Sequence, residues 1–116
     1  AFKFARNILS KNIKECIDML KDLEILKVDP SFVIISIYKE FQMIYLIKTT
    51  KDIKNLQFML GKESWQMNDY NLLKDNYTLD EIKKIIIKLA DYDYKYKSGL
   101  IDKSVVLDLL TLDLCD

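Results

Sequence analysis

The chain has 116 residues, half of them apolar, and its 18 basic and 18 acidic side chains give a formal net charge of zero. This length allows one domain with a hydrophobic core and is too short for two. The sequence has no His, only 2 Gly, 1 Pro and 2 Cys, which excludes imidazole metal sites, histidine-based nucleophile systems and glycine-rich phosphate-binding loops.

The cysteines carry no recognisable motif. Cys16 and Cys115 form no C-x-x-C pair and lie at opposite ends of the sequence, which fits neither a zinc site nor a small disulfide scaffold. We expect two reduced thiols in a cytoplasmic protein. Lys3 and Arg6 interrupt the first apolar residues, so no secretory signal is expected. The start at Ala1 rather than Met indicates a fragment of a longer chain.

The pattern of apolar residues predicts an all-α fold. These residues recur at spacings of three and four, and the scarcity of Gly and Pro disfavours sheets with tight hairpins. The most apolar stretch, residues 32–47, is too short to span a bilayer and predicts a buried helix. We expect a compact bundle of about six to seven helices in a single domain over residues 1–116, with helices near residues 2–9, 13–26, 30–49, 53–60, 65–73, 79–99 and 103–114.

Helix starts in the first half of the chain are marked by two patterns. Asn12 with Glu15 three residues later resembles a capping box and predicts the start of the second helix. Asp29 followed by Pro30 places a good N-cap before a proline in the first helical position, which predicts the start of the third helix.

Residue patterns that mark helix ends are clearer in the second half of the chain than in the first half. Gly61 is positioned to end the fourth helix in a left-handed conformation. Thr78 and Glu81 form a T-x-x-E capping box, and Tyr77 with Ile82 occupy the positions of a hydrophobic staple, so the sixth helix must start there. Asp102 is expected to cap the last helix, which is apolar over most of its circumference and therefore needs cover on several sides.

Two groups of side chains on the sixth helix invite a functional interpretation. Lysines and tyrosines alternate over residues 83–97 and suggest nucleic-acid binding, but aspartates on the same helix favour an ordinary solvated face. Asp93 continues the apolar stripe, and Lys97 lies one turn later on the same face. An internal ion pair or a hydrogen bond to a neighbouring helix end is the simplest role for Asp93, with a contact to another subunit as the alternative.

The remaining candidates are interpreted structurally. The aromatic residues Phe41, Tyr45, Phe58 and Trp65 have the spacing of core residues rather than of a ligand pocket. Cys16 lies on an apolar helix face, where a thiol acts as a small hydrophobe. No catalytic, cofactor-binding or metal-ligating residue is predicted.

Residues 77–114, YTLDEIKKIIIKLADYDYKYKSGLIDKSVVLDLLTLDL, resemble the C-terminal domain of the delta subunit of bacterial DNA polymerase III, which is part of the clamp loader. The resemblance rests on an aromatic-Thr cap, the pattern L-x-x-x-D-x-x-x-K-x-G and a leucine-rich last helix. The positions that match this pattern are Leu89, Asp93, Lys97 and Gly99, followed by Asp102 and residues 106–114. Residues 12–23 and 32–46 resemble two earlier helices of the family.

The resemblance implies a helical collar domain that binds no cofactor and catalyses no reaction, within the larger nucleotidyltransferase assembly of the polymerase III holoenzyme. It implies packing against the C-terminal domains of gamma/tau-type and delta-prime-type subunits, with the sliding clamp contacted only by an N-terminal part. It also implies little or no direct DNA binding and no membrane contact. Residues expected at subunit interfaces or in structural roles are Asp93, Lys97, Gly99, Leu107 and Leu110. The alternative is a helical nucleic-acid-binding module that uses residues 83–97.

Overall fold

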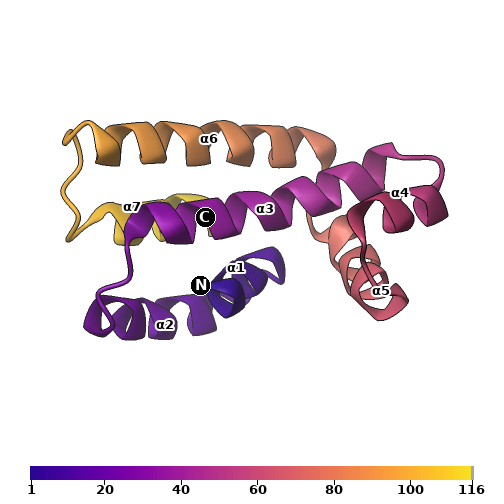
Figure 1. Cartoon of the computed structure of the whole chain (residues 1–116). Coiled ribbons are helices and arrows are strands. Elements are labelled where there is room, and N and C mark those ends of the chain that lie inside the picture. Colours follow the sequence, from indigo (N-terminus) through magenta and orange to yellow (C-terminus); the bar gives the residue numbers. More distant parts are fainter. Residues whose placement is uncertain (116) are drawn as a thin grey trace.

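The computed structural model describes residues 1–115 as seven α-helices and one short 3-10 helix, with no strand in that range (Figure 1). The predicted all-α fold is confirmed. The elements are α1 (Phe2–Leu9), α2 (Ile13–Ile25), α3 (Pro30–Thr49), α4 (Ile53–Leu60), α5 (Ser64–Leu73), the 3-10 helix Lys74–Asn76, α6 (Leu79–Lys97) and α7 (Val106–Leu114).

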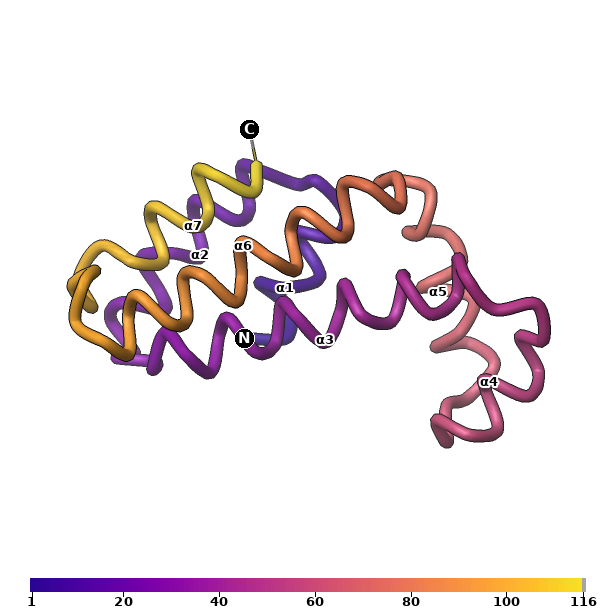
Figure 2. Tube along the Cα trace, turned by 90° about the horizontal axis from the view of Figure 1, so that it is seen from above, coloured from indigo at the N-terminus to yellow at the C-terminus, as the bar shows by residue number. Residues whose placement is uncertain are grey.

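Helix α3 is the centre of the bundle and packs most extensively against α6 and α1. Figures 1 and 2 both show α6 running beside α3. Apolar residues at spacings of three and four place one broad face of α3 in the core. The Phe41 ring meets the Tyr77 ring edge-on, with 5.0 Å between the centroids. The buried apolar residues of α3 after its first turn are Val33, Ile34, Ile37, Phe41, Met43, Ile44 and Ile47.

The capping box predicted for α6 is present. The Glu81 backbone N–H donates to Thr78 Oγ1 over 3.1 Å, and the Thr78 N–H donates to Glu81 Oε1 over 2.9 Å. Tyr77 and Ile82 are both buried, as a hydrophobic staple requires. These hydrogen bonds satisfy backbone donors that the first turn of a helix otherwise leaves without partners.

The capping box predicted at the start of α2 is wrong. Asn12 is the N-cap residue, but its side chain makes no capping hydrogen bond. Its backbone N–H donates instead to the Asn7 carbonyl over 2.9 Å, which completes the C-terminal turn of α1. Because so few residues separate the two helices, the end of α1 fixes the backbone of Asn12.

Four helices end in the same left-handed conformation. The residue after the C-cap has a positive φ at Lys11 (59°), Lys27 (53°) and Gly99 (80°), while Gly61 (65°) is itself the C-cap of α4. Paired backbone hydrogen bonds close each turn; at the end of α2, the Lys27 N–H donates to Glu24 over 3.1 Å and the next N–H to Leu23 over 3.2 Å. Glycine adopts this conformation freely, whereas for other residues it costs about 1–2 kcal/mol.

Helices α4 and α5 form an arm at the end of the bundle opposite the α6–α7 connection (Figures 1 and 2). The ends of the arm meet where Lys48 Nζ donates to the Lys74 carbonyl over 3.1 Å. Phe58 and Trp65 lie on this arm with 85% and 65% of their surface exposed. The prediction that they are core residues is therefore wrong, whereas Phe41 is buried as expected.

The two cysteines are free, as predicted, but the fold brings them near each other. Cys16 is fully buried on α2, and Cys115 follows α7, which packs against α2. Burial raises the pKa of the Cys16 thiol to about 12, with a further contribution from the neighbouring Cys115 thiol. At neutral pH Cys16 is therefore a protonated core residue, in agreement with its predicted apolar role.

Candidate subunit interface

The residues that the sequence predicts for an interface gather mainly at one end of the bundle. There the chain turns from α6 into α7, beside the turn that joins α2 to α3 (Figures 1 and 2). Leu107 lines a groove at this end, and Asp93, Lys97 and Gly99 lie in or after the last turns of α6. Leu110 is fully buried in the core of this chain.

Asp93 ties the end of α6 to the start of α3. Its Oδ1 accepts a hydrogen bond from Ser31 Oγ over 2.9 Å, and its Oδ2 pairs with Lys97 Nζ over 2.7 Å. Asp93 therefore makes both of the contacts that the sequence offered as alternatives, an ion pair within α6 and a hydrogen bond to a neighbouring helix end. Tyr96 lies beside the Asp29 carboxylate, and its pKa is raised by desolvation and by that carboxylate. The hydrogen bond between Asp93 and Ser31 holds the end of α6 against the start of α3.

The segment between α6 and α7 is shaped by local hydrogen bonds. Gly99 ends α6 with a positive φ, and nothing surrounds the position that a Cβ would occupy there. The Asp102 carboxylate accepts hydrogen bonds from the hydroxyl and from the backbone N–H of Ser104, and these bonds lower its pKa. Asp102 therefore fixes a turn, and α7 starts later than predicted, with Val105 as its N-cap residue.

A groove of about 330 Å³ lies between α2, the start of α3 and the start of α7. Leucine, valine and proline side chains make up its apolar part, and charged side chains surround them. Such a surface suits the side chains of a protein partner, because a few polar groups around an apolar floor fix orientation. The lining residues are Leu20, Leu23, Glu24, Lys27, Val28, Pro30, Asp102, Lys103, Ser104, Leu107 and Asp108.

Large apolar side chains near the groove are exposed. Ile25 and Leu26 at the end of α2 are 76% and 71% exposed, and Leu100 after α6 is 70% exposed. Leu109 and Leu112 on α7 are also exposed, as expected for a helix that is apolar on several sides. Ile25 and Leu26 lie between the groove-lining residues Glu24 and Lys27, and exposed apolar side chains beside a groove are typical of surfaces that bind other proteins.

Three of the five lysines at residues 83–97 of α6 form ion pairs, whereas Lys83 and Lys84 form none among the described residues. Lys88 pairs with Asp113 over 2.8 Å, and Lys95 pairs with Asp91 over 2.8 Å. Lys97 is occupied by Asp93, as described above. Binding to phosphates depends on uncompensated positive charge, so the geometry does not favour the nucleic-acid interpretation of residues 83–97.

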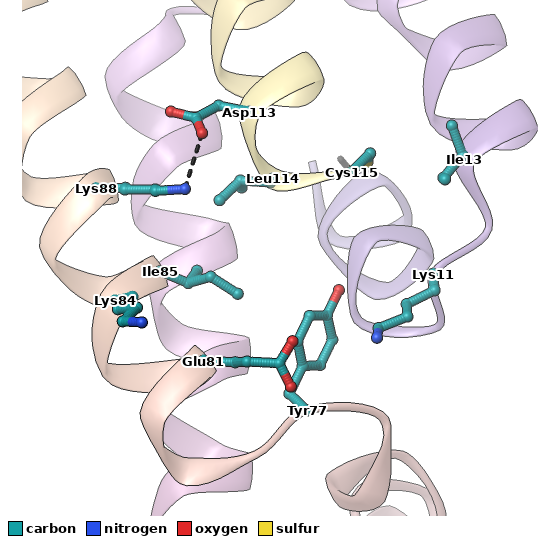
Figure 3. A pocket seen from close by; sticks show the side chains of 10 residues that line it. All are labelled: Lys11, Ile13, Tyr77, Glu81, Lys84, Ile85, Lys88, Asp113, Leu114 and Cys115. Carbon is teal, nitrogen blue, oxygen red and sulfur yellow. Dashed lines mark hydrogen bonds and ion pairs between the residues drawn. The ribbon is translucent and has the colours of Figure 1, made fainter.

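Figure 3 shows a pocket of about 210 Å³ at the other end of α7, where α6, α7 and the α1–α2 turn meet. Lys88 reaches across it to Asp113 and lowers the pKa of that carboxyl. Lys11 Nζ lies 4.7 Å from the centre of the Tyr77 ring, whose hydroxyl donates to the Ile8 carbonyl over 2.7 Å. Most of its polar groups have partners within the protein, so this pocket has the character of a structural junction.

A buried charged cluster joins α1, α3 and α5, and the sequence pattern did not reveal it. Glu40 is 3% exposed and pairs with Arg6 Nε over 3.3 Å, while the Tyr70 hydroxyl donates to its other carboxylate oxygen. The Arg6 guanidinium also lies 4.7 Å from the centre of the Tyr70 ring. Burial and the adjacent Glu40 raise the pKa of Tyr70 to about 12. The available signal was the position of Glu40 in the apolar stripe, three residues after Ile37.

Taken together, these features define an all-helical domain with an apolar groove at one end of the bundle. Within residues 1–115, no three His, Cys, Asp or Glu side chains are grouped so that they could hold a metal ion. None of the described helices is both long and apolar enough to cross a membrane. What the surface does offer is an apolar groove, exposed leucines and ion pairs that orient helix ends.

The chain belongs to the family formed by the C-terminal domain of the DNA polymerase III delta subunit, whose model matches residues 1–114. The resemblance inferred from residues 77–114 is thereby confirmed. The structure is similar to that of the Bacillus subtilis DNA clamp loader delta protein (YqeN), with a TM-score of 0.80 and 23% sequence identity. The match covers 98% of this chain and 35% of that protein, so the chain spans about a third of its relative's length. No curated protein matches the sequence.

Proposed function

We propose that residues 1–116 act as one non-catalytic assembly module of the DNA polymerase III clamp loader. The observation that carries the proposal is the apolar groove beside the α6–α7 turn, in a chain whose family is that of the delta subunit. In this proposal the module packs against the C-terminal domains of other loader subunits, of the gamma/tau and delta-prime types. Contact with the sliding clamp belongs to other parts of the delta subunit.

The physical support comes from the exposed side chains around the groove. Covering Ile25, Leu26 and Leu100 with a partner removes apolar surface from water, at about 25 cal/mol for each Å² buried. The Asp93–Ser31 hydrogen bond holds α6 against α3, so this end of the bundle is preorganised. A net charge of zero gives no long-range attraction for DNA and suits contacts with other proteins.

Mass measurement by light scattering tests this proposal. The chain is mixed with the C-terminal domain of a gamma/tau-type or a delta-prime-type subunit at tens of micromolar, roughly the range in which weak interfaces become visible. We expect a stable complex with at least one of them. The substitution Leu100→Glu places a charge on the exposed surface beside the groove, and we expect it to weaken the complex at least tenfold.

The matched control is Ile87→Glu, which adds the same charge at a similarly exposed apolar residue in the middle of α6. This variant is expected to bind like the unmodified chain. The proposal fails if neither domain forms a complex, or if both substitutions weaken the complex equally. Circular dichroism of each variant verifies that the helices are intact.

A further inference from the structure

Two pockets adjoin on one side of the molecule, where the arm leaves the bundle. One, of about 370 Å³, lies between the start of α1, the middle of α3 and α5, and the other, of about 630 Å³, lies at the α4–α5 junction. Lys62, between α4 and α5, lines both pockets. Figure 1 shows α1 and the arm on one side of α3 and α6 on the other. We call the surface formed by the residues that line either pocket the arm groove.

The arm groove has an excess of positive charge. Lys39, Lys54 and Lys62 line it, and none of them has an ion-pair partner among the described residues. Its acidic residues are already engaged, because Glu40 lies in the buried charged cluster and Glu63 is the N-cap residue of α5, where the positive end of the helix compensates its charge. The lysines are therefore free to bind an anionic ligand, although the net charge of the chain is zero.

Two aromatic rings of the arm groove are available for stacking. Phe2 and Phe58 expose 60% and 85% of their surface. The Arg6 guanidinium lies 5.0 Å from the centre of the Phe2 ring and 4.7 Å from the centre of the Tyr70 ring. Arg6 is itself held by Glu40 over 3.3 Å. Phe2 therefore combines a supported ring with a largely exposed surface, which suits stacking on a flat ligand.

The other lining residues distinguish a nucleic acid from an apolar peptide as the ligand. Among residues 1–115, no Leu, Ile or Val lines the arm groove, and its methionine, Met43, is only 9% exposed. An amphipathic helix of a protein partner finds no apolar floor here to cover. The groove instead offers lysine ammonium groups, aromatic rings and the Gln42 amide, which are groups that contact phosphates, bases and sugars.

We propose that the arm groove binds single-stranded nucleic acid. Lys39, Lys54 and Lys62 contact its phosphates, while bases stack on Phe2 and Phe58. A single strand is favoured over a duplex, because only unpaired bases can turn toward an aromatic ring. The arm lies at the opposite end of the bundle from the groove beside the α6–α7 turn, so this activity adds to the assembly role and does not depend on it (Figure 1).

Fluorescence anisotropy of a labelled oligo-dT of about 15 nucleotides tests the proposal, with oligo-rU of the same length measured beside it. We expect saturable binding at about 20 mM salt and a salt slope of roughly −2, because each of three neutralised phosphates contributes about −0.7 for a single strand. Binding of either strand supports the proposal, and the tighter one identifies DNA or RNA as the ligand. A duplex of the same length is expected to bind at least about tenfold more weakly, since its bases stay stacked.

The lysines are tested together. Replacing Lys39, Lys54 and Lys62 by Gln is expected to weaken binding at least about tenfold and to remove most of the salt slope. The matched control makes the same change of net charge at three exposed lysines of α2 and α6 that form no ion pair among the described residues, and we expect it to keep the affinity within about twofold. The residues replaced by Gln in the control are Lys14, Lys21 and Lys83.

The stacking is tested by Phe58→Ala, which removes an exposed ring and is expected to weaken binding at least about fivefold. Ile87→Ala, at an exposed apolar residue of α6, is its control and leaves binding unchanged. The proposal is overturned if neither strand binds saturably by about 100 μM protein, or if the two triple variants lose affinity equally. Duplex binding as tight as that of the single strands overturns it too. Tighter binding of a glutamate-rich peptide also overturns it and identifies an acidic protein partner instead.

Discussion

Replacing Glu40 by Ala removes the acceptor at the centre of the buried cluster that joins α1, α3 and α5. The substitution leaves the Tyr70 hydroxyl, on a residue that is 5% exposed, without its hydrogen-bond partner. It also removes the partner of Arg6, whose side chain is 24% exposed and lies 3.9 Å from the Asp69 carboxylate. The two losses of interaction energy differ in size, because the partly exposed Arg6 side chain can hydrogen-bond to water, whereas the buried Tyr70 hydroxyl cannot.

The unpartnered phenol hydroxyl costs about 1–3 kcal/mol. The partly exposed Arg6 adds up to about 1 kcal/mol, so we expect Glu40→Ala to lower the free energy of unfolding by about 1–4 kcal/mol. An unfolding entropy of about 2.1 cal/mol/K per residue gives about 0.24 kcal/mol/K for a chain of this length. The melting temperature should therefore fall by about 4–17 °C.

Thermal and urea unfolding, followed by circular dichroism, measure the change. Glu40→Gln is the control, because an amide still accepts the Tyr70 hydrogen bond while the charge is lost, and we expect it to cost about half as much. A double-mutant cycle that combines Glu40→Ala with Tyr70→Phe measures the coupling free energy between the two side chains, which we expect to be about 1 kcal/mol or more. A loss below about 1 kcal/mol for Glu40→Ala, or additive effects in the cycle, would refute the reasoning.

Two further changes probe the helix ends and the buried phenol. Lys27→Gly should raise the free energy of unfolding by about 0.5–1 kcal/mol, because φ at this position is 53° and glycine adopts a positive φ without strain. The control Lys21→Gly, in the middle of α2, should instead lower the free energy of unfolding by about 1 kcal/mol in the same urea titration. The pKa of Tyr70 is raised to about 12 from an ordinary value of 10, so its contribution is complete below pH 10 and is lost as the pH rises from 10 towards 12. Unfolding measured across this range should show a smaller alkaline loss for Tyr70→Phe, and an unchanged slope would contradict the assignment.

Local interactions explain which parts of the fold could be predicted. Asp29 caps α3 and Thr78 caps α6 through hydrogen bonds to residues only two or three positions away, so the sequence contains both partners. Gly61 ends α4 for a similar reason, because its backbone freedom is a property of the residue itself. The Asp93–Lys97 pair could be predicted from the helical repeat.

Tertiary partners decided the features that could not be predicted. Phe58 has the helical spacing of a core residue, but α4 lies in the arm at the end of the bundle, and the Phe58 side chain is exposed there. Glu40 looks like a polar interruption of α3, and its burial depends on Arg6 and Tyr70, which are far away in the sequence. The candidate interface also has a predictable and an unpredictable part. The contacts of Asp93 could be predicted from its position on the helix, whereas the groove forms only where α2, α3 and α7 meet.

The hydrogen bond from Lys48 to the Lys74 carbonyl bears on how this family can diverge. It shows that the chain leaves the bundle after α3 and returns to within reach of a single lysine side chain. Lengthening such a closed loop is inexpensive, at about 0.6 kcal/mol for each doubling. Insertions and deletions between Thr50 and Glu63 are therefore expected to leave the α1, α3 and α6 core intact, so the length of this segment can change while the core stays the same.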